Sequence, residues 1–347
     1  MNNSQTHAYR HWLLSSSVVC LALVLVFVIT SPAFAANPEE IPPSAASSGW
    51  TPFQFAVWHP VQVFDENTDV YGLRTSLFYG RNRNIYGIDF SLFSNAADDI
   101  YGLSILVFGN KLHHGIYPFT YWSLDQKRVP NIHGIQIGGG AVGAIGLILP
   151  FPIGYYAAIS TRAGNVDGAQ ISLLGNSALK VRGIQLASIA NYAESDLTGL
   201  QIAAIGNRAK GEGMAFQIGG IGNLTEGDYV GLQMGLFGNY NEGDYAGLQL
   251  SGLLGNGTYG RMRGFQMNGL WNTAGDMDGM QLSSIFNRIR RDGEGVQIGL
   301  LNISGKMKGL QIGAINYCRQ MTGIQIGGVN IIKESPLPFF PIINASF

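Results

Sequence analysis

Apolar and polar positions alternate in a short unit that recurs along most of the chain. A unit begins with Gly, continues with an apolar residue, Gln and a second apolar residue, and closes with Asn a few residues later. With the Gly as position 0, apolar residues stand at positions −2, 1, 3 and 6, and small residues usually stand at positions 4 and 5. Successive units start 14 to 17 residues apart, at Gly168, Gly183, Gly199, Ala215, Gly231, Gly247, Gly264, Gly279, Gly295, Gly309 and Gly323.

Less regular units come before this series. They start at Gly72, Gly87, Gly102 and Gly134. Two stretches rich in aromatic residues and proline, 117–123 and 150–156, interrupt the pattern. We interpret them as worn or expanded units, so the number of repeats between Gly102 and Gly168 stays open. A fixed period of this kind is typical of repeat architectures.

The alternation around Gln predicts a short β-strand in each unit, with Gln on the face opposite positions 1 and 3. We expect positions 1, 3 and 6 to face the interior and Gln to form a row outside. Positions 3 and 6 can share a face only if the chain bends at the small pair between them. Asn near the end of the unit suits a second bend, because Asn tolerates left-handed backbone.

Two all-β architectures fit these strands. In a β-solenoid of about 15-residue coils, like positions stack on like. In an antiparallel meander forming an outer-membrane β-barrel, each unit is one strand and one hairpin turn. Turns such as Asn241–Asp244 and the terminal aromatic Phe347 favour the barrel.

Three observations favour the solenoid. In the strands of a barrel, apolar and polar residues should alternate along the whole strand, but in these units the alternation breaks at positions 4 to 6. Barrel connections should alternate between short and long, but these are all short. Position −1 carries charged residues, such as Arg182, Asp278 and Lys308. In a straight barrel strand these charges would lie on the same face as the apolar residues at positions 1 and 3. We therefore predict a β-solenoid.

The N-terminal residues predict export. Arg10 and His11 precede an apolar run, Trp12–Thr30, which ends in Ser31-Pro32-Ala33-Phe34-Ala35. This order is that of a secretory signal peptide cleaved after Ala35. After the signal peptide we expect four segments: a linker over 36–48, an aromatic-rich N-terminal cap over 49–71, the glycine-rich repeat domain over 72–332 and a C-terminal cap over 333–347. We expect Phe339 and Phe340 to cover the last coil.

Composition narrows the classes of function. The formal charge of −1 and the 12 % of charged residues give no basic patch for nucleic acid. Cleavage at Ala35 would leave Cys318 as the one cysteine, so the fold must stand without an internal disulfide. The 48 glycines indicate tightly turned or closely approached backbone.

Little in the sequence suggests an active site or a cofactor. No nucleophile elbow, phosphate-binding loop or zinc-protease motif is present. His113-His114 stands without nearby Cys or acidic ligands, so we expect an exposed loop and no metal site. Glu226-Gly-Asp228 and Glu242-Gly-Asp244 stand one period apart, and with Arg288–Arg291 they predict solvated turns. We therefore expect no catalytic, cofactor-binding or metal-binding residues, and a structural ladder for the Gln row.

The repeats, together with the ending Pro336-Leu-Pro-Phe-Phe-Pro-Ile-Ile-Asn344 and the opening Val70–Arg74, resemble bacterial surface-repeat-containing proteins. The resemblance covers Tyr71–Phe347 and implies export and surface association, with no activity or site residues. We expect a non-enzymatic structural or binding scaffold at the cell envelope or outer membrane, with other surface proteins or glycans as possible partners. The alternatives are an integral outer-membrane β-barrel of unknown cargo and, more remotely, a carbohydrate-active β-helix enzyme.

Overall fold

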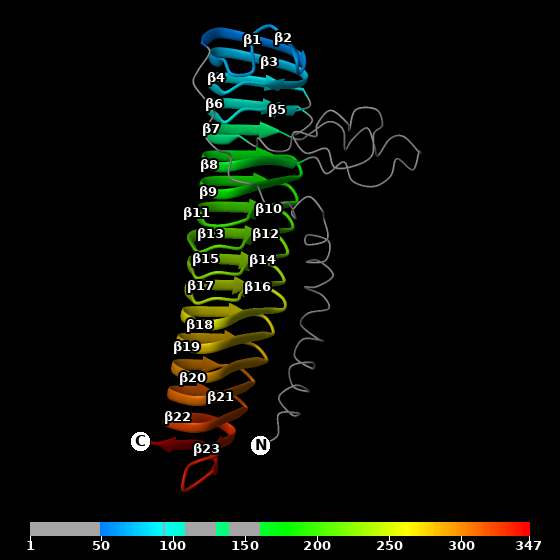
Figure 1. Cartoon of the computed structure of the whole chain (residues 1–347). Helices are drawn as coiled ribbons and strands as arrows, with labels where there is room; N and C mark the ends of the chain where they lie inside the picture. The colour runs from blue at the N-terminus through cyan, green and yellow to red at the C-terminus, as the bar shows by residue number, and fades with distance from the viewer. Residues whose placement is uncertain (1–48, 93, 108–129, 139–159) are drawn as a thin grey trace, which may run out of the picture.

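The chain forms a long rod of stacked coils. A computed structural model describes residues 49–92, 94–107, 130–138 and 160–347. In Figure 1, these coils succeed one another from β1 at one end to β23 at the other. Within the described residues the rod is a β-solenoid of about 14 turns, so the predicted fold class is confirmed.

The strands form three groups along the rod. The first group comprises β1 (Trp50–Trp58), β2 (Val61–Gln62), β3 (Asp69–Arg81), β4 (Asn84–Ser91), β5 (Ser94–Ala96), β6 (Asp99–Leu106) and β7 (Asn131–Gly138). The second comprises β8 (Ser160–Ser172), β9 (Gly175–Ala187), β10 (Ala190–Ala193), β11 (Leu197–Ala203), β12 (Gly206–Ala209), β13 (Gly213–Gly219), β14 (Gly222–Thr225), β15 (Tyr229–Gly235), β16 (Gly238–Asn241) and β17 (Tyr245–Ser251). The third comprises β18 (Gly255–Asn268), β19 (Trp271–Ser283), β20 (Phe286–Ile298), β21 (Leu301–Ile312), β22 (Ile315–Ile332) and β23 (Phe339–Ser346).

Neighbouring coils run parallel and in register. Gln201 pairs with Gln217, which pairs in turn with Gln233. Past the corner, the Ile221 amide donates to the Ile205 carbonyl at 2.7 Å. This is the register expected of a solenoid, and it excludes the antiparallel meander for these strands. The antiparallel pairs among the described strands, β1–β2 and β22–β23, lie at the two ends of the rod.

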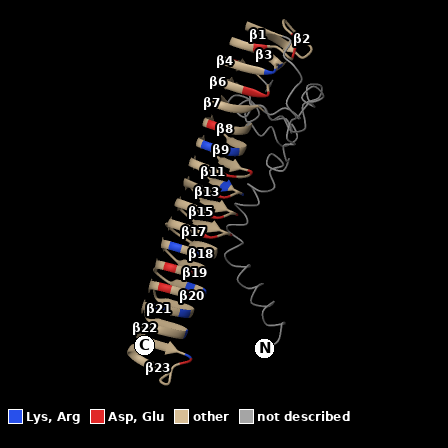
Figure 2. Ribbon diagram, turned by 60° about the vertical axis from the view of Figure 1, so that its left-hand side comes forward, with Lys and Arg blue, Asp and Glu red and all other residues tan. Residues whose placement is uncertain are grey.

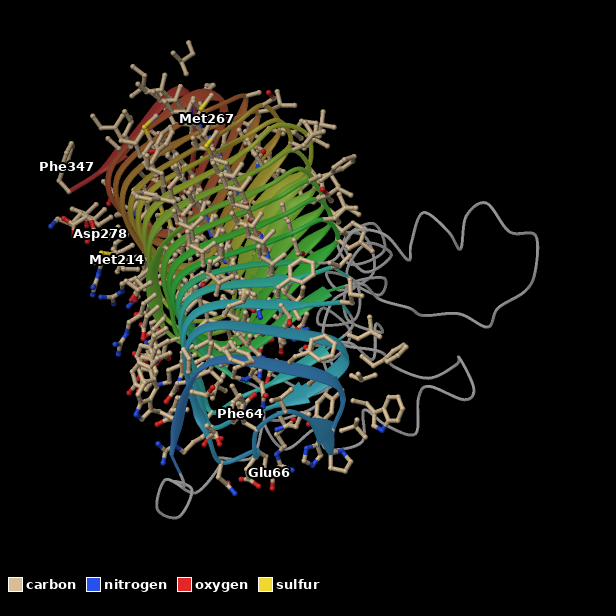
Figure 3. All side chains as sticks on the ribbon, turned by 90° about the horizontal axis from the view of Figure 1, so that it is seen from above. Phe64, Glu66, Met214, Met267, Asp278 and Phe347 are labelled. Carbon is tan, nitrogen blue, oxygen red and sulfur yellow. The ribbon has the colours of Figure 1, made fainter. Side chains whose placement is uncertain are left out.

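Each coil has two straight sides. The long side runs from position −2 to position 4, as in β11, and the short side carries the Asn, as in β12. The chain bends between them at Ala204 and Ile205, positions 5 and 6, so the predicted corner is present but lies one residue later than predicted, with Ala203 at position 4 still in the strand. A polar turn of two or three residues leads from the short side to the next long side. Figure 3, viewed along the rod, shows the coils superposed around one narrow interior.

The predicted direction of the side chains is wrong. Gln201 is 0 % exposed, whereas Ile202 beside it is 36 % exposed and Ile205 is half-buried. The residues that face inward are those at positions −2, 2 and 4 on the long side and the Asn and the residue two after it on the short side. Position −2, exemplified by Leu197, is buried as expected. The Asn residues lie within strands, so they do not make the second bend.

The Gly at position 0 allows the coils to approach closely. Gly199 has φ +135°, and a Cβ there would lie 2.0 Å from the carbonyl oxygen of Gly183 in the preceding coil. L-residues rarely adopt this φ, and no heavy atoms can approach to that distance. In the described coils that start from Gly72 to Gly323, position 0 is Gly with a positive φ everywhere except at Ala215, so glycine meets a steric requirement that most coils share.

The two ends of the rod differ from the expected caps. β1 is itself a first coil, because Phe53, Gln54 and Phe55 pair in parallel with positions 1, 2 and 3 of β3. Pro52 stands in this coil where Gly stands in others, so the 49–71 segment is a worn repeat as well as a cap. At the other end, β23 pairs with β22 through its backbone. The Phe339 and Phe340 side chains remain exposed, so the strand's backbone makes the cap.

Replacing Gly199 by Ala should destabilise the rod by about 3 kcal/mol, because the new methyl group requires both an unfavourable φ and a displaced carbonyl. Gly328→Ala is the control, since its Cβ would lie 3.3 Å from the nearest atom and its φ is ordinary. Urea unfolding followed by circular dichroism measures both variants. Equal midpoints for the two would contradict the steric role of position 0.

Candidate functional site

A column of glutamine amides runs through the interior of the long side. Each Gln donates from Nε2 to the Oε1 of the Gln one coil earlier, as in Gln201 to Gln185 (2.7 Å) and Gln217 to Gln201 (2.8 Å). The column continues with the same direction to Gln325. Each buried amide thus finds its partner in a copy of itself, which avoids the cost of an unpaired buried polar group. The predicted structural ladder is confirmed, but it lies inside.

A second amide column runs along the short side. Asn191 Nδ2 donates to Asn207 Oδ1 one coil later at 2.9 Å, and also to the Ile202 carbonyl at 2.8 Å. That carbonyl lies at position 3, next to the corner, and most coils repeat the contact. The carbonyl fixes which way the Asn amide points, since only the NH₂ group can face it. Asn therefore ties the short side to the corner of the next coil.

The two columns run in opposite directions along the rod. Gln N–H groups point toward the N-terminal end, and Asn N–H groups point toward the C-terminal end. Aligned amides polarise one another, so each column is cooperative. Because the directions oppose, their dipoles largely cancel over the length of the rod. The narrow interior therefore combines two polar amide columns with a continuous apolar core, to which position −2 contributes Leu197, Tyr229 and Met262.

The first coils replace the Gln column with a buried ion pair. Arg74 and Asp89 occupy position 2 of adjacent coils, both with fully buried side chains, and Arg74 Nε lies 2.7 Å from Asp89 Oδ1. Ser91 and Ser104 donate further hydrogen bonds to Asp89, at 3.2 Å each. Buried charges of this kind persist only when paired and hydrogen-bonded. The cluster is a variation of the same inward column.

The outer face of the long side is apolar. Positions 1 and 3 form two parallel columns of aliphatic and aromatic side chains, with Thr75 as the one polar residue at either position among the described regular coils. Phe216 is the most exposed of the described members within the regular units, at 56 %. Other members more than a third exposed are Leu73, Ile88, Phe90, Ile135, Ile137, Ile184, Ile202, Ile218, Met234, Leu248, Met267, Ile324 and Ile326.

The apolar surface continues around the corner. Positions 5 and 6 add a third exposed column, made by Leu77, Leu173, Leu236, Leu253, Ile285, Leu300 and Ile315. We call positions 1 and 3 together with this corner column the apolar side. Single exposed apolar residues are ordinary on protein surfaces, whereas contiguous apolar patches of several hundred Å² are typical of interaction surfaces.

The opposite boundary of the long side is polar. We call the turn before each long side, together with position −1, the charged edge. Its charges pair between adjacent coils: Arg291 with Asp276 (2.7 Å), Lys308 with Glu294 (2.9 Å) and Lys180 with Asp196 (3.1 Å). The Arg291 guanidinium holds the pKa of the Asp276 carboxyl below its usual value. Figure 3 shows nitrogen and oxygen atoms gathered on the side that carries Asp278, and Figure 2 shows both signs of charge interspersed along the rod.

Near the N-terminal end, position −1 carries a stack of rings. Tyr71, Tyr86, Tyr101 and His133 lie face to face with centroids 4.5, 4.9 and 4.6 Å apart. Desolvation in the stack raises the pKa of Tyr86 and of Tyr101. Because the ring faces contact one another, they are closed to the pyranose rings that stack on exposed aromatic faces.

The residues singled out in sequence take structural roles. His113 and His114 lie outside the described residues. Asp228 Oδ1 accepts the backbone amide of Asp244 at 2.7 Å, and Glu226 pairs with Arg208 of the preceding coil, so these acids hold turns together. Of the cationic run, Arg290 lies over the Tyr259 ring at 5.0 Å. Cys318 is buried. Burial raises the pKa of its thiol.

The described ranges contain neither a cluster of metal ligands nor a helix that could cross a membrane. No group of three or more His, Cys, Asp or Glu side chains is arranged there to hold a metal ion. In the same ranges, no helix has the length and hydropathy needed to cross a membrane. The feature that sequence reasoning missed is the apolar side itself, since its residues were expected in the interior.

Comparison with known proteins gives no relative. No protein family, no curated protein and no solved structure matches the chain.

Replacing Gln201 by Leu should cost about 2–5 kcal/mol, because it leaves the Gln185 oxygen and the Gln217 amide buried without their partners. Ile202→Gln, at the neighbouring outward position, should cost about 1 kcal/mol or less. Urea midpoints of the two variants test the direction of the side chains. A larger loss for Ile202→Gln would reverse the assignment of inside and outside.

The pair Arg74 and Asp89 offers a second test of the inward column. Arg74→Gln alone leaves a buried carboxylate without its cation and should cost about 3–5 kcal/mol. Arg74→Gln combined with Asp89→Gln replaces the ion pair by two adjacent amides, separated from Gln136 by Ser104, and should recover most of that loss. A double-mutant cycle measured by urea unfolding gives the coupling. A double variant less stable than either single variant would show that the site requires charge.

Proposed function

We propose that this chain is an exported, non-enzymatic scaffold of the bacterial cell envelope, attached through the apolar side of its rod. The observation that carries the proposal is the run of apolar residues at positions 1 and 3 on the outside of the coils. Two amide columns and the apolar core at position −2 already fill the interior, so burial within the described coils does not explain these side chains. An attachment surface does.

The arrangement of charges supports a binding or structural role over catalysis. Along the described charged edge, the ionisable groups pair with one another between coils, as Arg291 does with Asp276. An open groove on this edge is lined by Asp276, Glu294 and Lys308, and these groups are engaged in ion pairs that compete with a role as general acid or base. The remote alternative of a carbohydrate-active enzyme gains no support from the aromatic stack, whose ring faces are covered. The barrel alternative falls with the parallel register.

Export remains a prediction from the N-terminal residues. The apolar run and the Ala33-Phe34-Ala35 exit lie outside the described residues, so the proposal rests here on the sequence pattern. The resemblance to surface-repeat proteins points the same way. The partners proposed are the cell envelope or outer membrane and, beyond them, other surface proteins or glycans.

Fractionation of bacteria producing the full chain tests this function. We expect the protein in the envelope fraction, with Ala36 as its N-terminal residue by Edman sequencing, because cleavage after Ala35 follows translocation. A variant with Ala33→Arg and Ala35→Arg blocks the small-residue exit and should keep Met1 or the uncleaved segment. A wild-type protein that begins at Met1 and remains in the cytosolic fraction would contradict the proposal.

A further inference from the structure

We propose that the apolar side lies against the acyl chains of a lipid surface, with the rod parallel to that surface and its charged edge in water. This inference deepens the proposed function by naming what the scaffold attaches to, and it rests on that function only for its cellular setting. It is carried by the extent, the shape and the boundaries of the apolar side.

The extent of the apolar side exceeds that of an ordinary surface patch. With about 14 turns spaced by roughly 4.8 Å, the columns run for on the order of 65 Å. Positions 1, 3 and 5 span roughly 13 Å across the coil, so the patch covers on the order of 800 Å². The largest apolar patch of a typical monomer is about 300–600 Å². A surface of this size requires an occupant.

The shape of the apolar side favours lipid over a second copy of the chain. The columns at positions 1 and 3 lie on a nearly flat sheet, and a face-to-face dimer could cover them. The corner column does not lie on that sheet, because the chain bends there, as at Leu236 and Leu300. A second flat face would leave this third column in water. Acyl chains are fluid and can surround a convex edge.

The uneven size of the side chains on the apolar side also favours lipid over a protein partner. Within one column, side-chain size changes from Ala169 to Phe216, and from Leu248 to Phe265 one coil further. Two protein faces that pack together need matched knobs and hollows. Lipid needs no such complementarity. An irregular but uniformly apolar surface is therefore suited to a fluid partner.

The polar boundary of the apolar side is what a rod lying at the interface between lipid and water requires. The charged edge follows the long side along the rod, as the hydrophilic face follows an amphipathic helix in a membrane surface. Its charges neutralise one another in pairs, such as Lys308 with Glu294. The rod therefore lacks the surplus of Lys and Arg that attracts anionic lipid. Binding should depend on apolar contact and change little with salt.

Vesicle flotation tests the proposal directly. The purified full chain is mixed with neutral phosphatidylcholine vesicles and centrifuged through a density gradient, at 0.1 M and at roughly 1 M NaCl. Since the screening length falls from about 10 Å to about 3 Å between these conditions, an electrostatic attachment would weaken strongly. We expect the chain to float with the vesicles equally well in both.

A matched pair of double variants identifies the surface responsible. Phe216→Asp with Leu236→Asp places two charges on the apolar side, and Thr198→Asp with Thr322→Asp places two charges at position −1 of the charged edge without removing an apolar side chain. All four residues are exposed. We expect vesicle affinity to fall at least tenfold for the first variant, since two apolar contacts become charges. The second should bind as wild type.

Three outcomes decide the question. Equal flotation of the wild type and of the apolar-side variant would overturn the proposal, because attachment would then come from elsewhere, such as the stretch 139–159, which contains no charged residue. Wild type that stays below the vesicles but dimerises through Phe216 and Leu236, as measured by light scattering, would assign the surface to a second copy. Envelope location in cells without flotation would overturn this inference and leave the proposed function standing. Urea midpoints confirm that both variants fold.

Discussion

Hydrogen bonding between identical side chains of successive coils is the interaction on which the rest of this rod depends. An amide carries both a donor and an acceptor, so a column of amides satisfies every member except those at its ends. The column at Gln201 and the column at Asn191 do this on the two sides of one narrow interior. Such a column forms only if the coils are parallel, in register and evenly spaced. The fold's regularity is therefore a consequence of its polar core.

The glycine at position 0 and the amide at position 2 both depend on the close spacing of adjacent coils. Amide partners must approach to about 2.8 Å, as Gln217 does to Gln201, which requires coils at the ordinary strand spacing. At Gly199 the backbone turns so that a side chain would strike the preceding coil. Glycine removes that obstacle. The irregular first coils change the column to Arg74 and Asp89 but keep Gly72 and Gly87. The coil of Gln217 does the reverse, because it keeps its amide and carries Ala215 at position 0, so neither condition is absolute.

The period and the small residues were sufficient to predict a parallel solenoid with a corner after each long strand, although the bend lies at positions 5 and 6 and was predicted at 4 and 5. They were insufficient to predict which face was inside, because we assumed that apolar residues point inward, which is only a tendency. Two signals in the sequence pointed the other way. Charged residues at position −1, such as Arg182, share the parity of positions 1 and 3, and small residues such as Ala203 share the parity of Gln. The first coil was missed because Pro52 replaces its glycine.

An apolar exterior in every coil cannot be explained by the strands alone. Apolar neighbours in a column do stabilise a sheet, and β-branched residues favour the extended backbone. Threonine, however, meets both conditions without exposing a fully apolar side chain, and it stands at positions 1 and 3 of the described regular coils only as Thr75. The polar core leaves the outer positions without a role in coil register, so their residues can vary in size from Ala169 to Phe216. What they share is hydrophobicity, which is the property that the proposed contact with lipid requires.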